Sequence, residues 1–481
     1  MVFDAEGTGL DIGFLCNGWT PDLGGVETHC QGLAGELMAR GHRVHVLCLD
    51  TREGLEPYTV AETEVGGVAV RRMAYRYHDH RALADLVESP RADDVIHAWL
   101  AEVPVDLVHV HHATGFGLSA LRAIADVGRP LAVTLHDYWS LCPRGQMLRT
   151  DGEVCREATP SRCAPCLAET WPHLMPSGAG ERRGPGGAPV EDDAAAAEQR
   201  TRFAHEMLGL AQRVFTPSAA ARDVFVRAGL DAARVRVVEN GVDVGTLAKR
   251  TASLRSAREP DDGELRLGVL GTVLPSKGAL ELARALLAAN APHLVLEIHG
   301  NLPSYHGDES YIAELRALSE REPRVRVMGA FEHAQLPAIL ARLDGVAAPS
   351  RWAEVFGLTV REARAAGLPV LVSDAGDLPS VAAGGAAGIV VGADDRAGWI
   401  AALERFHDDA EARAAWGAFA AEPRTNGELA LELEHAYAEL VLEGTGALPR
   451  FAYPIAGIAT RRTPAGSPKR SLFGRLFGGR S

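Results

Sequence analysis

Short apolar runs of the β type alternate with helical patterns along most of the sequence. In the first half such runs include 11–16, 43–49, 106–111 and 130–135, and a second series begins at 265. Because parallel strands need a crossover connection, usually a helix, this alternation is typical of parallel sheets with helices on both faces. The sequence therefore predicts an α/β protein with two doubly wound, Rossmann-like domains.

The chain of 481 residues is longer than one hydrophobic core usually organises, which also favours several domains. We expect an N-terminal domain, an interdomain linker, a C-terminal domain, a helix that packs back on the first domain and a basic tail, at 1–240, 241–264, 265–424, 425–448 and 449–481. Within the first domain, 139–170 is expected to be a loop that carries cysteines. The segment 176–190 is rich in Gly and Pro and is expected to be a flexible loop.

The charge and hydropathy of the chain exclude several classes of protein. The formal net charge is -14, which is the wrong sign for a protein whose whole surface binds nucleic acid. No window holds the ~18 uninterrupted apolar residues that a transmembrane helix requires. The segment Met1 to Thr8 lacks the cationic start of a secretory signal. We expect a cytoplasmic protein whose partners do not include nucleic acid.

The end of the sequence has the opposite charge. From Pro449 to Ser481 there are seven basic residues and no acidic one, in a context rich in Gly, Pro and Ser. Leu and Phe stand among these cations, which is the composition of segments that bind an anionic membrane surface. We expect a disordered tail that holds the protein peripherally at the inner face of the membrane. A tail that binds nothing is the alternative.

Two glycine-containing turns stand between a strand and a helix, one in each half of the chain. The first contains Gly24 and Gly25, and the second runs from Gly271 and Thr272 to Lys277. Backbone N–H groups at a helix N-terminus bind anions, and a lysine there adds a positive charge suited to a diphosphate. A simple connecting turn and a solvated lysine are the structural alternatives. Neither turn has the spacing of the dinucleotide fingerprint or of a Walker loop.

The most informative stretch is Pro349 to Ala363, which contains two glutamates. Glu354 belongs to the loop after a strand, whereas Glu362 falls within the helix that begins near Gly357. Two glutamates on such a segment are usually solvated, but the apolar residues around them favour burial, and a buried carboxylate needs partners. We expect one glutamate to contact a ligand in the interdomain cleft and the other to bind a ribose.

With these residues the sequence resembles the retaining GT-B glycosyltransferases of family 4. The resemblance extends from Leu10 to Glu443 and rests on motifs in the family's order: Gly24-Gly25-Val26-Glu27 followed by Arg40-Gly41-His42, His136-Asp137, Asn240-Gly241-Val242-Asp243, and Glu354-x7-Glu362. The last motif is the most specific. The resemblance implies a GT-B fold, in which two Rossmann-like domains face a cleft. It also implies transfer of a hexose from a nucleoside-diphosphate sugar to a hydroxyl of a glycan or a lipid-linked acceptor.

The resemblance implies roles for single residues as well. His136 would lie near the anomeric carbon, Glu354 would bind hydroxyls of the transferred sugar, and Glu362 would bind the ribose. The donor phosphates would lie against Lys277 and against the turns on both walls of the cleft: Gly24, Gly25, Gly271, Thr272, Phe356, Gly357 and Leu358. Lys277 and the helix N-terminus would take the place of a cation, so no cofactor is expected for catalysis.

Two positions depart from the family pattern. Many relatives carry an arginine where this chain has Thr272, so Lys277 has to neutralise more of the phosphate charge, with help from Arg351. A later loop reads Gly376-Asp377-Leu378-Pro379-Ser380, where relatives often have Gly-Gly-x-Pro-Glu. The core pair of glutamates is intact, so we expect activity to survive both changes.

Four cysteines lie close together in the sequence, at Cys142, Cys155, Cys163 and Cys166. Their spacing includes a C-x-x-C pair, and four thiolates would complete a tetrahedral structural zinc site. Such a site would shape the loop near the acceptor, because four protein ligands leave no position open for a reaction. Free buried thiols and a redox pair are the alternatives.

Two other functions fit the same motifs. A nucleotide-sugar 2-epimerase on this fold would need no acceptor. A non-catalytic subunit that binds a nucleotide sugar is conceivable because of Thr272 and Ser380. The Gly-Gly-Val-Glu turn and His136-Asp137 favour transfer, so we expect a glycosyltransferase of glycan, glycolipid or polysaccharide biosynthesis.

Overall fold

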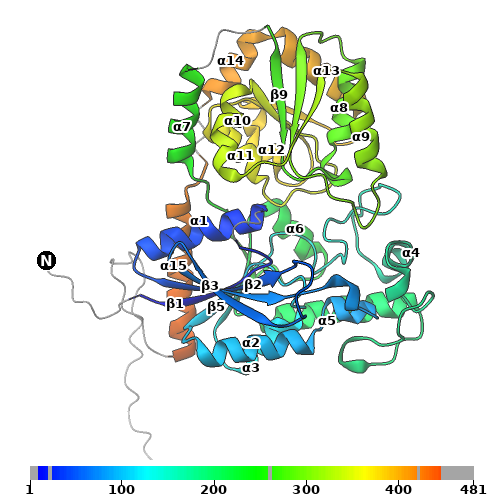
Figure 1. Cartoon of the computed structure of the whole chain (residues 1–481), viewed down its shortest axis with the longest axis vertical. Helices are drawn as coiled ribbons and strands as arrows, with labels where there is room; N and C mark the ends of the chain where they lie inside the picture. Colours follow the sequence, from blue (N-terminus) through cyan, green and yellow to red (C-terminus); the bar gives the residue numbers. More distant parts are fainter. Residues whose placement is uncertain (1–8, 20–23, 258–262, 420–422, 446–481) are drawn as a thin grey trace, which may run out of the picture.

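Two β-sheets, each covered by helices, form the two halves of the molecule, which lie one above the other in Figure 1. The computed structural model describes residues 9–19, 24–257, 263–419 and 423–445. The first sheet has the strand order β3-β4-β2-β1-β5-β6-β7-β8 and the second has the order β11-β10-β9-β12-β13-β14. In both sheets, successive strands are added first on one side of the domain's first strand and then on its other side, which is the doubly wound arrangement. The predicted fold of two Rossmann-like domains is confirmed.

The first domain has a sheet whose central strands are buried on both faces, so their sequences read as continuous apolar runs. All its strands pair in parallel except β3, which forms an antiparallel hairpin with β4. The strands are β1 Asp11–Leu15, β2 Arg43–Asp50, β3 Val60–Val65, β4 Val68–Ala74, β5 Leu107–Val110, β6 Leu131–Thr134, β7 Arg213–Thr216 and β8 Val235–Val237. The helices are α1 Gly25–Ala39, α2 Pro90–Glu102, α3 Ser119–Asp126, α4 Pro160–Thr170, α5 Asp193–Leu210 and α6 Ala219–Arg227.

The second domain repeats this architecture with a fully parallel sheet. Its strands are β9 Leu265–Leu270, β10 Leu294–His299, β11 Val325–Gly329, β12 Gly345–Ala348, β13 Val370–Ser373 and β14 Gly388–Val391. Its helices are α8 Ala279–Ala288, α9 Ser310–Arg321, α10 Leu336–Arg342, α11 Leu358–Ala365, α12 Leu378–Val381, α13 Arg396–Asp408 and α14 Ala410–Ala418. Two separate apolar clusters fill the two sides of this sheet.

The segment expected to be a linker, 241–264, contains a helix of the second domain. Helix α7 spans Val244–Ser256 and packs against α10 and α11. Its N-cap is Asp243, whose carboxylate accepts a hydrogen bond from the backbone N–H of Thr246. Leu247 is buried in the same apolar cluster as the α10 residues. The polar, charge-rich sequence of the exposed face hid this helix from the sequence analysis.

The C-terminal helix α15, Asn426–Thr445, crosses back to the first domain and packs on α1 (Figure 1). The Arg40-Gly41-His42 motif holds it there, because Glu434 of α15 accepts hydrogen bonds from Arg40 and contacts the ring of His42. Tyr437 of the same helix hydrogen-bonds with Nδ1 of His109 in the first sheet, with 2.6 Å between the atoms. The Arg40-Gly41-His42 motif, which the sequence analysis used for the family resemblance, thus has a structural role: it holds α15 on the first domain.

The two domains touch directly beside the cleft. Trp352 and Val355 of the second domain belong to an apolar cluster made mostly of first-domain residues. The ring of Trp352 meets that of Tyr138 edge to face at 5.8 Å between centroids. Ser218, the N-cap of α6, donates a hydrogen bond to the backbone carbonyl of Val355 at 2.6 Å. These contacts fix the loop that carries Glu354 against the first domain.

The segments expected to be loops in the first domain have defined packing. The cysteine-bearing segment 139–170 includes α4, which begins at Pro160 and packs against α5. The segment 176–190 lies against the first domain: Val190 is buried in a small apolar cluster, and Arg183 forms an ion pair with Asp85. The segment 139–170 is thus a loop that ends in a helix, and prolines and cysteines mask the short helical pattern at 160–170.

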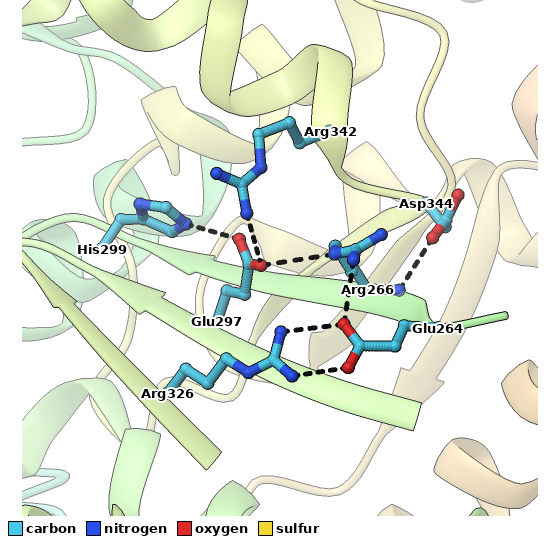
Figure 2. Close-up of polar contacts among 7 residues, drawn as sticks. All are labelled: Glu264, Arg266, Glu297, His299, Arg326, Arg342 and Asp344. Atoms are coloured by element: carbon cyan, nitrogen blue, oxygen red, sulfur yellow. Dashed lines mark hydrogen bonds and ion pairs between the residues drawn. The ribbon is translucent and has the colours of Figure 1, made fainter. Parts of the chain in front are cut away.

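The second sheet holds a polar network across β9, β10 and β11, centred on the buried Glu297 and shown in Figure 2. Glu297 of β10 is 1% exposed, and its carboxylate contacts Arg342, Arg266 and His299. Arg266 continues the network to Glu264, which also accepts hydrogen bonds from Arg326. A buried carboxylate is tolerated here because cations and hydrogen bonds surround it.

In the part of the chain that the structure describes, no helix is long and apolar enough to cross a membrane. The expected basic tail, 449–481, lies outside the described residues.

Candidate active site between the two domains

A cavity of about 310 Å³ lies between the domains and is lined by residues from both. It sits at the carboxyl ends of β6, β9 and β12, which is where ligands bind in doubly wound sheets. Nine of the residues predicted for the site line it: Gly25, His136, Gly271, Thr272, Lys277, Glu354, Phe356, Gly357 and Leu358. Residues far apart in the sequence thus meet at one place.

Lys277 is fixed by the turn between β9 and α8. The residue after it, Gly278, has φ +72 and is the N-cap of α8. A side chain at this position would also place its Cβ 2.1 Å from the backbone oxygen of Pro349, so only glycine fits. The turn therefore holds the lysine directly at the helix N-terminus, on the cleft wall.

Glu354 is the centre of a small polar cluster on the same wall. The carboxylate is 6% exposed and forms an ion pair with Lys277. The same oxygen accepts hydrogen bonds from Ser350 Oγ at 2.6 Å and Trp352 Nε1 at 2.9 Å. The ammonium of Lys277 also lies over the ring of Trp352, 5.1 Å from its centroid. Both the lysine and the carboxylate are therefore held in place before any ligand binds.

Helix α11 begins at the cleft. Its N-cap, Gly357, has φ 69 and ψ 58, a left-handed conformation that favours glycine. A Cβ there would lie 2.8 Å from the side chain of Leu378. Phe356, Gly357 and Leu358 line the cavity, and the first N–H groups of a helix have no partner within the helix. This helix end can bind an anion on the same domain wall as Lys277.

Glu362 lies one turn further along α11 and is 4% exposed. It does not line the cavity but hydrogen-bonds with Nε2 of His333 at 2.8 Å. This hydrogen bond, together with the negative charge, raises the pKa of His333 and outweighs the partial desolvation of its ring, whose side chain is 43% exposed. Glu362 is thus beside the cavity, with an imidazole as its present partner.

His136 and Asp137 come from the first domain, directly after β6. His136 lines the cavity, and its Nε2 lies 3.2 Å from Nδ1 of His111. Asp137 pairs with His112 Nε2 at 3.0 Å. Burial lowers the pKa of His112, but the charge and hydrogen bond of Asp137 outweigh it and the net shift is upward. The pKa of His136 is held well below its usual value, first by burial and then by the neighbouring histidines.

Two predicted residues lie elsewhere. Gly24 is exposed, does not line the cavity, and donates its backbone N–H to Glu27 at 2.9 Å. Arg351 faces away from the cleft and pairs with Asp394 at 3.1 Å. The expected help of Arg351 in neutralising the phosphates does not match this placement, because the backbone N–H of Arg351 bonds to Ser276 and turns the side chain outward.

The four clustered cysteines share one neighbourhood without forming a compact ligand set. Burial, and to a smaller degree the thiols of Cys142, Cys155 and Cys166, raise the pKa of Cys163 to about 12. Cys166 accepts a weak hydrogen bond from Arg144, and the thiol of Cys155 donates to the carbonyl of Glu157. Among the described residues, no three of these sulfurs lie within 4.8 Å of one another. Zinc binding by the cysteines stays a prediction.

Several site residues were missed in the sequence. Asn240, Asp137 and Trp352 line the cavity, and Ser350 both lines it and hydrogen-bonds with Glu354. Asn240 and Asp137 stand in motifs that the sequence analysis quoted, so their motifs were the available signal. His333 had none, because its role depends on α11 lying beside the loop before α10.

Two known protein families match this chain. The family described as Glycosyltransferase Family 4 matches residues 23–246, and the family described as Glycosyl transferases group 1 matches residues 252–422. Together they cover both domains and meet at the domain junction. The chain is a glycosyltransferase like those of family 4, with the GT-B fold.

Curated relatives match this glycosyltransferase over most of its length. It is 27% identical over 416 residues to the phosphatidyl-myo-inositol mannosyltransferase of Mycolicibacterium smegmatis, which covers 86% of this chain and 89% of that one. It is 29% identical over 424 residues to the D-inositol 3-phosphate glycosyltransferase of Kineococcus radiotolerans, covering 84% and 86%.

Solved structures share the fold of this glycosyltransferase. HepE from Anabaena, in complex with UDP and glucose, superimposes with a TM-score of 0.58 at 19% identity, covering 91% of this chain and 100% of that one. Sucrose-phosphate synthase from Thermosynechococcus elongatus gives a TM-score of 0.62 at 18% identity, with 90% and 100% covered.

Proposed function

We propose that this glycosyltransferase moves a hexose from a nucleoside-diphosphate sugar to a hydroxyl acceptor, with retention of configuration at the anomeric carbon. The observation that carries the proposal is that the Lys277–Glu354 pair and the N-terminus of α11 line the same cavity. A cation and the N–H groups at the start of a helix, lining one cavity, suit a diphosphate. The solved structure of HepE with UDP and glucose supports the same class of donor.

The residues of the cavity divide the work of the proposed reaction. Lys277 and the N–H groups at the start of α11 would stabilise the negative charge that develops on the departing diphosphate. When the donor binds, its phosphate would replace the carboxylate of Glu354 as the partner of Lys277. Glu354 could then accept hydrogen bonds from sugar hydroxyls. Glu362 would exchange His333 for a ribose hydroxyl. His136 reaches the cavity from the first domain, the side from which the acceptor would enter.

The acceptor we propose is a glycan or a lipid-linked molecule with a free hydroxyl. Both full-length relatives named above act, by their names, on inositol-containing acceptors. Inositol phosphates and phosphatidylinositol are therefore the first acceptors to examine. We place the reaction in glycan, glycolipid or polysaccharide biosynthesis, with no metal required for catalysis because Lys277 and α11 supply the positive charge.

The experiment is release of nucleoside diphosphate from a panel of sugar donors, with and without acceptors. Replacing Lys277 by Ala removes the only side-chain cation described in the cavity lining, and we expect turnover to fall by about 10²-fold or more. Glu362→Ala is expected to raise KM for the donor. Lys249→Ala is the matched control, because Lys249 is exposed on α7 away from the cavity. Wild-type turnover in Lys277→Ala together with a wild-type KM in Glu362→Ala would contradict the assignment.

Product analysis separates transfer from epimerisation. With donor alone, an epimerase converts the sugar and needs no acceptor, whereas the proposed transferase releases nucleotide slowly and speeds up when acceptor is added. Tight nucleotide binding without turnover on any donor and acceptor would favour a non-catalytic subunit. Stereochemistry at the anomeric carbon, read by NMR of the product, tests retention.

A further inference from the structure

Three histidines from different parts of the first domain meet beside the cleft. His29 lies in the second turn of α1, His111 follows β5, and His136 follows β6. Since β5 and β6 are neighbours in the sheet, both strand ends lie together under α1. One ring nitrogen of each histidine lies within 4.8 Å of those of the other two, and no other such group of histidine, cysteine or carboxylate ligands occurs in the described chain.

The spacing of the three rings fits a single small cation. Nδ1 of His111 and Nε2 of His136 are 3.2 Å apart. Two nitrogen ligands of a tetrahedral zinc, with Zn–N near 2.0–2.1 Å, lie about 3.4 Å from each other. The ring centroids are separated by 4.7 Å for His29 and His136, 5.4 Å for His29 and His111, and 5.5 Å for His111 and His136. The three rings are mutual neighbours, and one nitrogen of each lies within 4.8 Å of those of the other two.

Several ring nitrogens of this group have no hydrogen-bond partner. His29 is 3% exposed and His111 is 1% exposed. Both ring nitrogens of His29 are buried without a partner, and so is Nε2 of His111, while its Nδ1 contacts Nε2 of His136. His109, one layer deeper in the sheet, shows the usual solution, because Tyr437 and Thr134 occupy its two nitrogens. Buried polar atoms without partners are costly and point to a missing ligand.

The electrostatic state of the rings suits metal binding. Burial lowers the pKa of His29 to about 3 and holds those of His111 and His136 well below the usual value. Burial thus favours the neutral imidazole, which is the form that binds a metal. Neutral imidazoles select zinc, cobalt, nickel or copper over magnesium and calcium, which prefer oxygen ligands.

We propose that His29, His111 and His136 form a binding site for one divalent transition-metal ion, of which Zn²⁺ is the representative. Three protein ligands leave a fourth position, and the exposure of His136 to the cleft cavity directs that position toward the cleft. The site is separate from the cysteine cluster, which comes from 142–166. Occupancy also engages the imidazole of His136, so a bound ion is expected to slow the transfer reaction. This consequence alone rests on the proposed function.

The test is a titration of the full chain, stripped with a chelator, with CoCl₂. To remove the competing thiolates, the titration uses protein with Cys163→Ser and Cys166→Ser. We expect one equivalent of Co²⁺ with the visible absorption of a four-coordinate ion, no thiolate-to-cobalt charge transfer, and displacement by ZnCl₂. His29→Gln and His136→Gln are each expected to lose the bound equivalent. His112→Gln is the control, because its two nitrogens already contact Asp137 and Thr114.

The outcomes decide the site independently of the enzyme activity. Absence of the absorption, or its survival in His29→Gln and His136→Gln, overturns the proposal. Circular dichroism shows whether His29→Gln folds; if it does not, the result for the partly exposed His136→Gln decides. The cobalt spectrum needs no donor or acceptor, so it can show a metal site even if the protein is not a transferase. Conversely, the absence of a metal site would not affect the nucleotide-release assay.

Discussion

At the scale of single residues, the site depends on pairs that are far apart in sequence. Lys277 and Glu354 are each recognisable in their motifs, but their ion pair forms because the β9–α8 turn and the β12–α11 loop follow neighbouring strands. Glu362 and His333 form a second pair of this kind. In both pairs a partner occupies a group that the proposed donor would use, so ligand binding is an exchange of partners.

The pair of His333 and Glu362 predicts a pH-dependent contribution to stability. The pKa of His333 is raised in the folded protein, so the pair stabilises the fold fully below the unfolded value of about 6.5. This contribution is lost as the pH rises through the folded value. We expect the difference in unfolding free energy between wild type and His333→Gln to be larger at acid than at alkaline pH. Urea unfolding over that range measures it.

Exchange of the exposed His293 for Gln provides a control for that titration. A difference that is independent of pH, or that grows toward alkaline pH, would contradict the pairing. A second consequence is that saturating nucleotide should reduce the pH dependence, because the ribose would replace His333 at Glu362.

At the scale of elements, the second domain depends on the polar network around Glu297 (Figure 2). Three strands and α10 contribute to it, and Glu297 itself is almost fully buried on β10. Burial raises the pKa of Glu297, but the hydrogen bond of His299 and the charges of Arg342 and Arg266 outweigh it and lower the pKa. The network therefore ties the edge strand β11 and helix α10 to the centre of the sheet.

Glu297→Gln tests this network. The variant keeps the shape of the side chain but leaves Arg266 with one carboxylate fewer, and we expect a loss of about 3 kcal/mol, as for broken buried ion pairs. Because the pKa is lowered, the carboxylate stabilises the fold above its unfolded pKa and loses this effect as the pH falls. Thermal and urea unfolding measure both. Glu320→Gln, exposed on α9, is the control; equal losses would contradict the prediction.

Several elements were difficult to predict for identifiable reasons. Strand β3 has the sequence VAETEV and is almost wholly exposed, so it lacks the apolar face that marks a strand. Helix α7 has few apolar residues, and Leu247 alone anchors much of it in the core. Helix α4 contains Pro165 and two cysteines, which disguise its period. Each element is stabilised mainly by tertiary packing, which overrides weak local preference.

At the scale of the whole molecule, the charge of the chain is distributed unevenly. The basic segment 449–481 carries seven of the 49 lysines and arginines and none of the 63 acidic residues. The first 448 residues then have 42 basic and 63 acidic residues, a net charge of -21. The acidic part holds the cleft, while the basic end could hold it at an anionic surface where lipid-linked acceptors lie.

Co-sedimentation with liposomes tests this prediction. Each basic residue near an anionic surface contributes about 1 kcal/mol, so the full chain should sediment with anionic vesicles at low salt and dissociate at high salt. The chain ending at Leu448 should stay in the supernatant under both conditions, and neutral vesicles serve as the control. Equal binding of the two chains would contradict a role for the tail.

The sequence by itself determined the fold class and most of the candidate site. Alternating apolar runs fix the parallel sheets, and the motifs around Gly271, Lys277 and Glu354 identify their carboxyl-end loops, because these are properties of neighbouring residues. Only the tertiary structure decided which side chains contact one another: Lys277 with Glu354, Glu362 with His333, Arg351 with Asp394, and His29 with His111 and His136. The residues in these contacts are 25 to 107 positions apart in the sequence. Strand order and packing bring them together, and no local sequence pattern does.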